Sequence, residues 1–568
     1  MKKIWFKSAL VALAGMSVSS CGDFLDIYPL TMVYEDNYWN EKNDVDQIVA
    51  GCYTRMQDDD FMRRLFIWGE VRSDNVGRGY YSKYNGASPE ADILNENILS
   101  TNVYTDWSPF YSVIDRCNLV IERAPQVAAV DPSYLESDMN ATIAEVSALR
   151  ALCYFYLVRT FKDVPYYTYA ITNDEQPLDL EVTKGDEIIR YLIEDLTKVH
   201  DQALTAWPSQ NGQDVSYARI TQNAIDALLA DMYLWIGDYA NAAERAQRVL
   251  KSKTEYFEGR YSSSLMVDGY PLIPDNGTVV QPGTAYNYNF GSGGGPESIF
   301  ELEFSSSTTD GSKSNTMVPA LFRRFLPEKD LPADYGYFGP ERGLWDEWGS
   351  ATVFESNEDS RVKESIWLDD ASDPSVACIA KYAYSAIYPR MENDLVYASG
   401  QRLSKNDANW VFYRVSDMML IRAEALVCQM SDNGSERDAE LADEAFRLID
   451  AVEARSSRNT TSSLDPDDYV SRNSLLNLVY LERRREFMFE GKRWFDLVRR
   501  TRQEGNDTDW LVQQIRNKFN TATATSKFGH PDAIYWPYNY DELRVNDNLQ
   551  QNPAYPDSDN SSYESTAE

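Results

Sequence analysis

The stretch Leu475–Arg500, LLNLVYLERRREFMFEGKRWFDLVRR, decides how the rest of the chain is interpreted. It opens as a helix whose apolar stripe continues, at helical spacing, into Glu482, Arg485 and Glu486. Three ionisable side chains therefore fall on the face that should be buried. A buried charge is tolerated only when it is paired and hydrogen-bonded, so we expect these three residues to form an internal structural ion network.

A catalytic interpretation of the same carboxylates also exists. Glu482 and Glu486 are one helical turn apart, and an acid and a base of this kind would suit a glycoside hydrolase. The intervening arginines, 483–485, should hold both carboxylates ionised, which suits no general acid. Structural ion networks often resemble active sites, so the structural interpretation is favoured. The helix is expected to cover 475–490 and to stop or bend at Gly491.

The stretch resembles the helical signature of the SusD/RagB family, the surface glycan-binding lipoproteins of Bacteroidetes. The pattern ERRREFxFEGxRWFDLxR is found within Glu482–Arg500, beginning at Glu482, with Met488 and Lys492 among the variable places. Three other segments also resemble the family, and they are EVSALRALCYFYLVRTFKDVPYY at 145–167, YRVSDMMLIRAEAL at 413–426 and WPYNYDELRVNDNLQQNPAY at 536–555. The resemblance implies non-catalytic capture of an oligosaccharide or polysaccharide and its delivery to a SusC-like TonB-dependent transporter.

Helical repeats are predicted directly from the apolar periodicity. Residues 222–250 contain two apolar stripes separated by Gly237-Asp238-Tyr239, which resembles the turn of a tetratricopeptide helix pair. A second such pair is expected at 413–455. Between them, 255–410 has little helical period and many Gly, Pro, Tyr and Ser residues. We therefore predict a mainly α protein, with a tetratricopeptide-like helical-repeat scaffold and a large irregular, loop-rich insertion.

The predicted organisation has six parts along the 568 residues. They are a lipoprotein signal peptide at 1–20, an extended segment at 21–45, a helical repeat part at 46–254 with a ligand loop near 70–84, the irregular ligand-binding insertion at 255–410, a second helical repeat part at 411–505, and a C-terminal segment and tail at 506–568.

The N-terminus predicts export and lipid anchoring. Residues 1–20 have a basic start and an apolar run too short to span a bilayer, which is typical of a secretory signal. The sequence Val18-Ser-Ser-Cys21 resembles a bacterial lipobox, so Cys21 is the expected acylation site. The alternative is an ordinary secreted cysteine. We expect an outer-membrane lipoprotein that faces the cell exterior.

Composition excludes several classes of function. The formal net charge of −35 repels phosphate backbones and argues against nucleic-acid binding. The chain has only two histidines, His200 and His530, which nearly excludes a histidine-based triad or a multi-histidine metal site. The five cysteines after Cys21 lack the spacing of a disulfide framework or zinc site. No cofactor is expected, and the sequence leaves a structural calcium open.

Candidate ligand contacts lie in two places. A flat exposed aromatic ring can stack on the C–H face of a sugar, while carboxylate, amide and guanidinium groups bind its hydroxyls. The aromatic candidates in the insertion are Tyr286, Tyr288, Tyr335, Tyr337, Trp345 and Trp348. In the loop 70–84, which loosely resembles a ligand loop of the family, the candidates are Asp74, Arg78, Tyr80 and Tyr81.

Three alternatives to glycan capture are left open. The same architecture could capture peptides, which a basic or amide-rich cleft with few exposed aromatics would favour. A surface glycoside hydrolase would show two opposed carboxylates about 5–10 Å apart in a cleft. A repeat scaffold that binds only protein would lack an aromatic-lined cleft.

Overall fold

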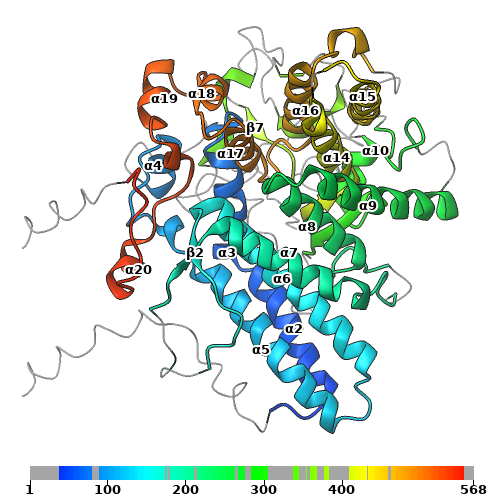
Figure 1. Ribbon diagram of the computed structural model, residues 1–568, viewed down its shortest axis with the longest axis vertical. Coiled ribbons are helices and arrows are strands. Elements are labelled where there is room, and N and C mark those ends of the chain that lie inside the picture. Colours follow the sequence, from blue (N-terminus) through cyan, green and yellow to red (C-terminus); the bar gives the residue numbers. More distant parts are fainter. Residues whose placement is uncertain are drawn as a thin grey trace, which may run out of the picture.

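The helices of this protein form one continuous stack around a single large apolar core (Figure 1). The computed structural model describes residues 38–79, 88–172, 176, 179–209, 214–261, 266–275, 283–304, 337–344, 353–354, 359–367, 377–382, 408–431, 433–457 and 462–555.

Each long helix packs against the next one along the chain. The stack consists of α2 (Lys42–Met56), α5 (Ser108–Val130), α6 (Glu136–Phe161), α7 (Gly185–Val199), α8 (Gln222–Trp235), α9 (Tyr239–Arg260), α14 (Val415–Gln429), α15 (Glu436–Ser456) and α16 (Arg472–Glu486). Because α9 packs directly on α14, the insertion leaves the stack uninterrupted. Contacts mainly between neighbours are typical of repeat proteins, and the predicted mainly α, tetratricopeptide-like scaffold is confirmed.

The α8–α9 pair shows how local sequence builds a repeat. Thr221 caps α8 by accepting a hydrogen bond from the backbone N–H of Ala224, and Asp238 caps α9 in the same way. Between the helices Gly237 has φ +80°, a left-handed conformation that glycine adopts without steric cost. Ala242 is fully buried and lets the two helices approach closely.

α6 is the most apolar helix of the stack. It is the one described helix long and apolar enough to cross a membrane, but 94% of that apolar window is buried inside the fold. Its neighbours α5 and α7 cover it on two sides (Figure 1). α6 is therefore the central core helix of the first repeat part.

The signature helix ends earlier than its sequence predicts. α16 ends at Glu486 instead of continuing to residue 490, and α17 (Arg493–Gln503) begins after a turn in which Phe489 has φ +67° and Gly491 φ +71°. The buried carboxylate of Glu70 accepts hydrogen bonds from the backbone N–H groups of Phe489 and Lys492, at 3.1 and 3.2 Å. A residue distant in sequence therefore replaces the helical hydrogen bonds of this turn.

The N-terminal boundary also differs from the prediction. Residues 21–37 lie outside the described part, but α2 begins at Lys42, inside the segment expected to be extended. Asp44 explains the early start, because its carboxylate accepts hydrogen bonds from the backbone N–H groups of Asn40 and Glu41.

Short two-stranded ladders fasten the described parts of the insertion. The pairs are β4 (Ser298–Leu302) with β8 (Trp410–Arg414), β1 (Val76–Arg78) with β5 (Phe338–Pro340), and β6 (Ile366–Trp367) with β7 (Cys378–Ile379). β2 (Val164–Pro165) pairs with β3 (Val182–Thr183) outside the insertion. Because β8 runs directly into α14, its ladder with β4 ties the insertion to the scaffold.

The described structure also contains shorter α-helices and two π-helical turns. They are α3 (Asp59–Phe66), α4 (Pro89–Leu94), α10 (Thr284–Tyr286), α12 (Ser360–Ser365), α18 (Asp509–Ile515), α19 (Thr521–Lys527), α20 (Tyr540–Val545) and the π-helical turns η1 (Ile67–Val71) and η5 (Asn287–Ser292). The last three α-helices follow α17 along one side of the molecule (Figure 1).

Candidate ligand-binding surface

Asp74 belongs to the interior of the protein. Its side chain is only 3% exposed, and its two carboxylate oxygens accept hydrogen bonds from Arg493 at 2.9 and 3.0 Å. Burial alone would raise the pKa of Asp74, but the guanidinium groups of Arg484 and Arg493 outweigh it and lower the pKa to about 2. This placement differs from the expectation of a ligand contact, because tertiary ion pairs enclose the carboxylate.

Arg78 is exposed at the end of β1, as a ligand contact requires. Its guanidinium lies over the ring of Tyr337, 5.8 Å from the ring centroid. Tyr337 itself is 3% exposed, and its carbonyl accepts a hydrogen bond from the backbone N–H of Gly79. Tyr337 therefore supports Arg78 from below and, contrary to the prediction, presents little surface of its own.

Tyr286 is also enclosed. Its ring is 3% exposed and packs against Phe290, and its hydroxyl donates a 2.8 Å hydrogen bond to the carbonyl of Ala380. The prediction that Tyr286 faces a ligand therefore does not agree with its position. Its neighbour two residues on, Tyr288, is 38% exposed and remains available.

Tyr288 belongs to a group of partly exposed tyrosines that we call the tyrosine cluster, consisting of Tyr217, Tyr256, Tyr261 and Tyr288. The rings of Tyr256 and Tyr261 lie 6.2 Å apart at the end of α9. Partial burial raises the pKa of Tyr261, and Tyr256 and Tyr288 raise it further, which places both phenols near it. Residues from three separate segments thus meet at this surface.

A glycine turn brings Tyr217 and Tyr288 together. Gly293 and Gly294 both have positive φ, +67° and +60°. A Cβ on Gly294 would lie 2.3 Å from the ring of Tyr217, and one on Gly295 would lie 2.8 Å from the Cβ of Tyr288. Glycine is therefore required both for the backbone conformation and for the close approach of the rings.

Charged groups surround the tyrosine cluster. Arg260 donates a 2.9 Å hydrogen bond to the hydroxyl of Tyr256 and pairs with Asp214 at 3.5 Å. The hydroxyl of Tyr217 donates to the carboxylate of Glu303 at 3.4 Å. All three charged residues are exposed. The surface therefore combines aromatic faces with a guanidinium and two carboxylates that remain accessible to water.

Sequence reasoning identified one member of this cluster and missed three. Tyr256 and Tyr261 lie at the end of α9, and Tyr217 lies before α8, outside the loops that the sequence marks as candidates. The available signal was that Tyr256 and Tyr261 are among the first residues of the aromatic-rich insertion at 255–410. Five other candidates lie outside the described residues, namely Tyr80, Tyr81, Tyr335, Trp345 and Trp348, as does the expected lipidation site Cys21.

The three ionisable residues of the signature helix are buried. Glu482 and Glu486 have no exposed surface and Arg485 is 2% exposed, pairing with Glu482 at 3.5 Å. The carboxylate of Glu486 is bound by Arg414, Arg455 and Arg361. These charges belong to the interior of the fold and do not open to a substrate.

The two carboxyl groups differ in electrostatics. Burial would raise the pKa of Glu486, but its three arginine partners lower it well below the usual range. For Glu482 burial outweighs Arg361 and Arg485, so its pKa is raised. The sequence predicts that arginines hold both carboxyls ionised. The lowered pKa of Glu486 agrees with this prediction, and the raised pKa of Glu482 does not.

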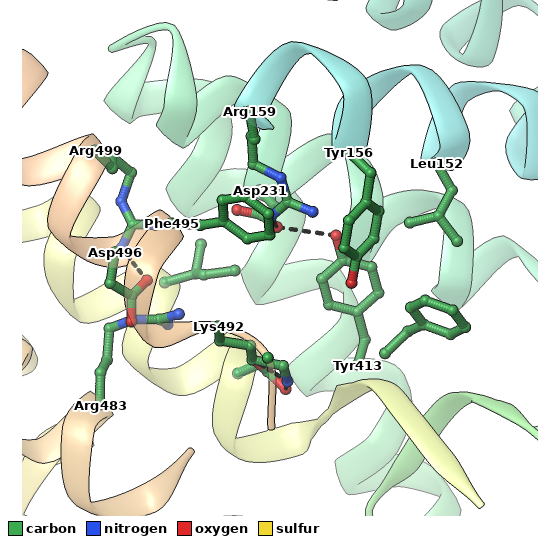
Figure 2. A pocket seen from close by; sticks show the side chains of 14 residues that line it. Leu152, Tyr156, Arg159, Asp231, Tyr413, Arg483, Lys492, Phe495, Asp496 and Arg499 are labelled. Carbon is green, nitrogen blue, oxygen red and sulfur yellow. Dashed lines mark hydrogen bonds and ion pairs between the residues drawn. The ribbon is translucent and has the colours of Figure 1, made fainter. Parts of the chain in front are cut away.

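A small polar cavity lies among α6, α8, α14 and α17 (Figure 2). Ion pairs and hydrogen bonds cross its walls: Tyr413 donates to Asp231 at 2.9 Å, and Arg483 to Asp496 at 2.9 Å. Its volume of about 20 Å³ has room for a water molecule, whereas small-molecule sites typically enclose roughly 300–1,000 Å³. The cavity cannot accommodate a saccharide. Among the described residues, no three His, Cys, Asp or Glu side chains converge in a way that could hold a metal ion.

Two buried carboxyl groups of the insertion lie against each other. Asp275 accepts a hydrogen bond from the hydroxyl of Ser360 at 2.9 Å, and Glu364 accepts one from the backbone N–H of Gly283 at 3.0 Å. Burial raises the pKa of Glu364 well above its usual range, and the hydrogen-bonded Asp275 raises it further. Burial also raises the pKa of Asp275, although Arg455 opposes this. We therefore expect the pair to keep a shared proton above the pH at which an ordinary Glu carboxyl ionises.

Glu364→Gln is expected to remove a pH-dependent loss of stability. A carboxyl whose pKa is raised by folding stabilises the protein fully below its unfolded pKa, and this contribution is lost as pH rises through the folded pKa. The free energy of unfolding of the wild type should thus fall relative to that of Glu364→Gln as pH rises above the ordinary value of 4.5. Urea unfolding of both proteins across this range checks it. A difference that does not change with pH contradicts the shared proton.

Comparisons with known proteins agree with this architecture. The family model described as the SusD family matches residues 345–555, and the model described as starch-binding associating with outer membrane matches residues 23–234. SusD-like protein P38 of Formosa agariphila is 24% identical to this chain over an alignment 570 residues long. The alignment covers 95% of this chain and 96% of that protein.

Solved structures show the same fold. Surface glycan-binding protein A of Bacteroides uniformis superposes with a TM-score of 0.61 at 20% identity, covering 90% of this chain and 99% of that one. A laminarin-binding SusD-like protein superposes with a TM-score of 0.60 at 21% identity, covering 91% and 100%. Given these matches and the signature carried by α16 and α17, the chain belongs to the SusD/RagB family.

Proposed function

We propose that this protein captures an oligosaccharide or polysaccharide at the outer membrane without cleaving it, and delivers it to a SusC-like TonB-dependent transporter. The tyrosine cluster is the observation that carries the proposal, because it presents partly exposed aromatic faces on a rigid scaffold. The glycan-binding and laminarin-binding relatives support a carbohydrate ligand, and the family description supports association with the outer membrane.

The chemistry around the cluster suits a neutral glycan. Aromatic faces match the C–H faces of sugar rings, and Asp214, Arg260 and Glu303 offer donors and acceptors for hydroxyl groups. The net charge of −35 disfavours a strongly anionic polysaccharide. Since all three polar groups are exposed in the free protein, exchanging water for sugar hydroxyls would leave no charge buried without a partner.

The remaining predicted contacts enter the proposal in two roles. Arg78 is a proposed direct contact, together with the candidates outside the described residues, Tyr80, Tyr81, Tyr335, Trp345 and Trp348. Asp74, Tyr286 and Tyr337 are enclosed, so we assign them a supporting role and no direct contact with the ligand.

Tyr288→Ala is expected to weaken glycan binding about tenfold, the effect of losing roughly 1.4 kcal/mol of stacking. The matched control is Tyr191→Ala, since Tyr191 is 47% exposed on α7 and lies outside the cluster. Affinity gel electrophoresis of the chain from residue 22 onward, against a panel of polysaccharides, measures both. Trp345→Ala and Trp348→Ala are run beside them.

The outcomes of this experiment separate the candidate functions. Retardation by one glycan that is lost in Tyr288→Ala and kept in Tyr191→Ala supports capture at the tyrosine cluster. Equal loss in both variants argues against this location. If no glycan retards the wild type, peptide capture by the same architecture takes its place.

Lipid anchoring through Cys21 is part of the proposal. Several acyl chains on one cysteine would hold the protein stably at the membrane, because more than one chain is needed for stable anchoring. Cys21→Ala is expected to abolish incorporation of labelled palmitate and to release the protein from the membrane fraction. Equal labelling of wild type and variant would exclude this residue as the anchor.

A further inference from the structure

The carboxylates of the signature stretch form ion pairs with an arginine and a lysine of the insertion. Glu482 and Glu486 lie one helical turn apart on α16, and Glu490 follows in the turn after it; we call these three residues the socket. All three are buried, with at most 1% exposure. Arg361 on α12 enters the socket, 2.5 Å from Glu482 and 3.1 Å from Glu486.

Lys381 is the second cation of the insertion in the socket. Its ammonium lies 3.1 Å from the carboxylate of Glu490 and donates a 2.9 Å hydrogen bond to the backbone carbonyl of Glu486. Lys381 is 4% exposed. A buried ammonium requires its partners in place, since its desolvation would otherwise cost several kcal/mol. The position of Lys381 is therefore dictated by the scaffold.

A short path of contacts connects Lys381 to the tyrosine cluster. The preceding residue, Ala380, accepts the 2.8 Å hydrogen bond from the hydroxyl of Tyr286. The ammonium of Lys381 also lies 5.1 Å from the ring centroid of Phe290. Tyr286 and Phe290 flank Tyr288, which stands between them on the same turn. Two contacts thus hold the segment that carries the exposed ring.

The other side of Lys381 is fixed as well. The backbone N–H of Ala380 donates to the carbonyl of Ser365 at 2.8 Å, and β7 pairs with β6 in register Ile366 to Ile379. Arg361 and Lys381 therefore belong to one connected unit of the insertion. Both cations of that unit are held by the same row of carboxylates.

We propose that Lys381 is a positioning residue for ligand capture: seated in the socket, it sets the place of segment 283–292 and hence of the Tyr288 ring. This proposal rests on the proposed function for its effect on glycan affinity. The signature stretch thereby acquires a role in binding, although none of its charged groups reaches the ligand surface.

Lys381→Met tests the proposal, because methionine keeps an unbranched apolar stem and removes the ammonium. Glu490 keeps a partner in the variant, since Arg414 binds it at 2.8 Å. The expected result is about a fivefold to tenfold loss of glycan affinity by titration calorimetry, within the usual range of coupling through contact networks. Amide hydrogen exchange should rise in 283–292 and stay unchanged in α8.

Two further variants make the result specific. Lys492→Met is the matched control, because Lys492 lies 3.8 Å from the same Glu490 but binds Asp417 on the scaffold side. It should leave glycan affinity within about twofold of the wild type. Tyr286→Phe removes only the hydroxyl that bonds Ala380, and should lower affinity in the same direction as Lys381→Met by about threefold.

Each outcome decides the proposal. Loss of affinity in Lys381→Met and Tyr286→Phe but not in Lys492→Met supports it. Unchanged affinity in Lys381→Met, or exchange that rises equally in α8 and 283–292, overturns it. If the wild type binds no glycan, the proposed function fails, and hydrogen exchange alone then decides: a rise confined to 283–292 supports positioning, and its absence overturns it.

Discussion

Replacing Glu486 by alanine is expected to lower the free energy of unfolding by about 3–5 kcal/mol. Glu486 has no exposed surface and is the common partner of Arg361, Arg414 and Arg455, which come from the insertion, β8 and α15. Each arginine keeps at least one other carboxylate, but removing Glu486 would leave a local excess of positive charge buried. The loss of stability therefore comes from buried arginine charge that the remaining carboxylates do not fully balance.

Chemical denaturation followed by circular dichroism measures this cost. Glu244→Ala is the control, since Glu244 forms an exposed pair with Arg248 one turn along α9 at 2.6 Å. An exposed pair of this kind contributes about 0.3–0.5 kcal/mol. Should Glu486→Ala prove as mild as Glu244→Ala, the buried network would have to be solvated in the native protein.

Gly69→Ala is expected to destabilise the protein by about 3 kcal/mol, at the upper end of the cost of overpacking. A Cβ at position 69 would lie 1.8 Å from the backbone carbonyl oxygen of Gly491. Neither partner is a flexible side chain, so the overlap can be relieved only by separating η1 from the turn between α16 and α17. That separation would also break the hydrogen bonds that Glu70 accepts from this turn.

The matched control for this prediction, Gly51→Ala, is expected to change stability in the opposite direction. Gly51 lies inside α2, and a Cβ there would meet nothing within 4 Å. Gly51→Ala should therefore stabilise the protein by about 0.5–1 kcal/mol, because alanine is the better helix former. Thermal unfolding of both variants measures the contrast. A neutral Gly69→Ala would show that the two backbone segments do not touch.

Most of the helical scaffold could be predicted because its signals are local. The stripes of 222–250 and the Gly237 turn contain within about thirty residues what a helix pair needs: an apolar face, caps and a left-handed turn residue. The same holds for α14 and α15. Their pairing with α9 follows from burying these faces against each other.

The end of α16 could not be predicted in the same way. The apolar stripe continues through Phe489, and Gly491 is the first local stop. The helix ends earlier because Glu70 supplies hydrogen-bond acceptors for the turn, and it does so across 419 residues of sequence to Phe489. Long-range contacts of this kind leave no trace in a local pattern.

The buried charges of the signature show the same division. Their burial follows from helical phase, which sequence determines. Their ion-pair partners do not follow from helical phase. The neighbouring Arg483 binds Asp496, and Arg484 binds Asp74. Glu486 is instead bound by three arginines from other elements. Which cation pairs with which carboxylate depends on how distant segments pack.

Sequence by itself determined the family, the repeat scaffold and the presence of an aromatic-rich insertion, because periodicity, turn residues and the signature are local properties. Tertiary structure alone decided which aromatics are available. It encloses Tyr286 and Tyr337, exposes Tyr288 and adds Tyr217, Tyr256 and Tyr261 beside it. Exposure is set by what the rest of the chain places over a side chain, and that is a property of packing across hundreds of residues.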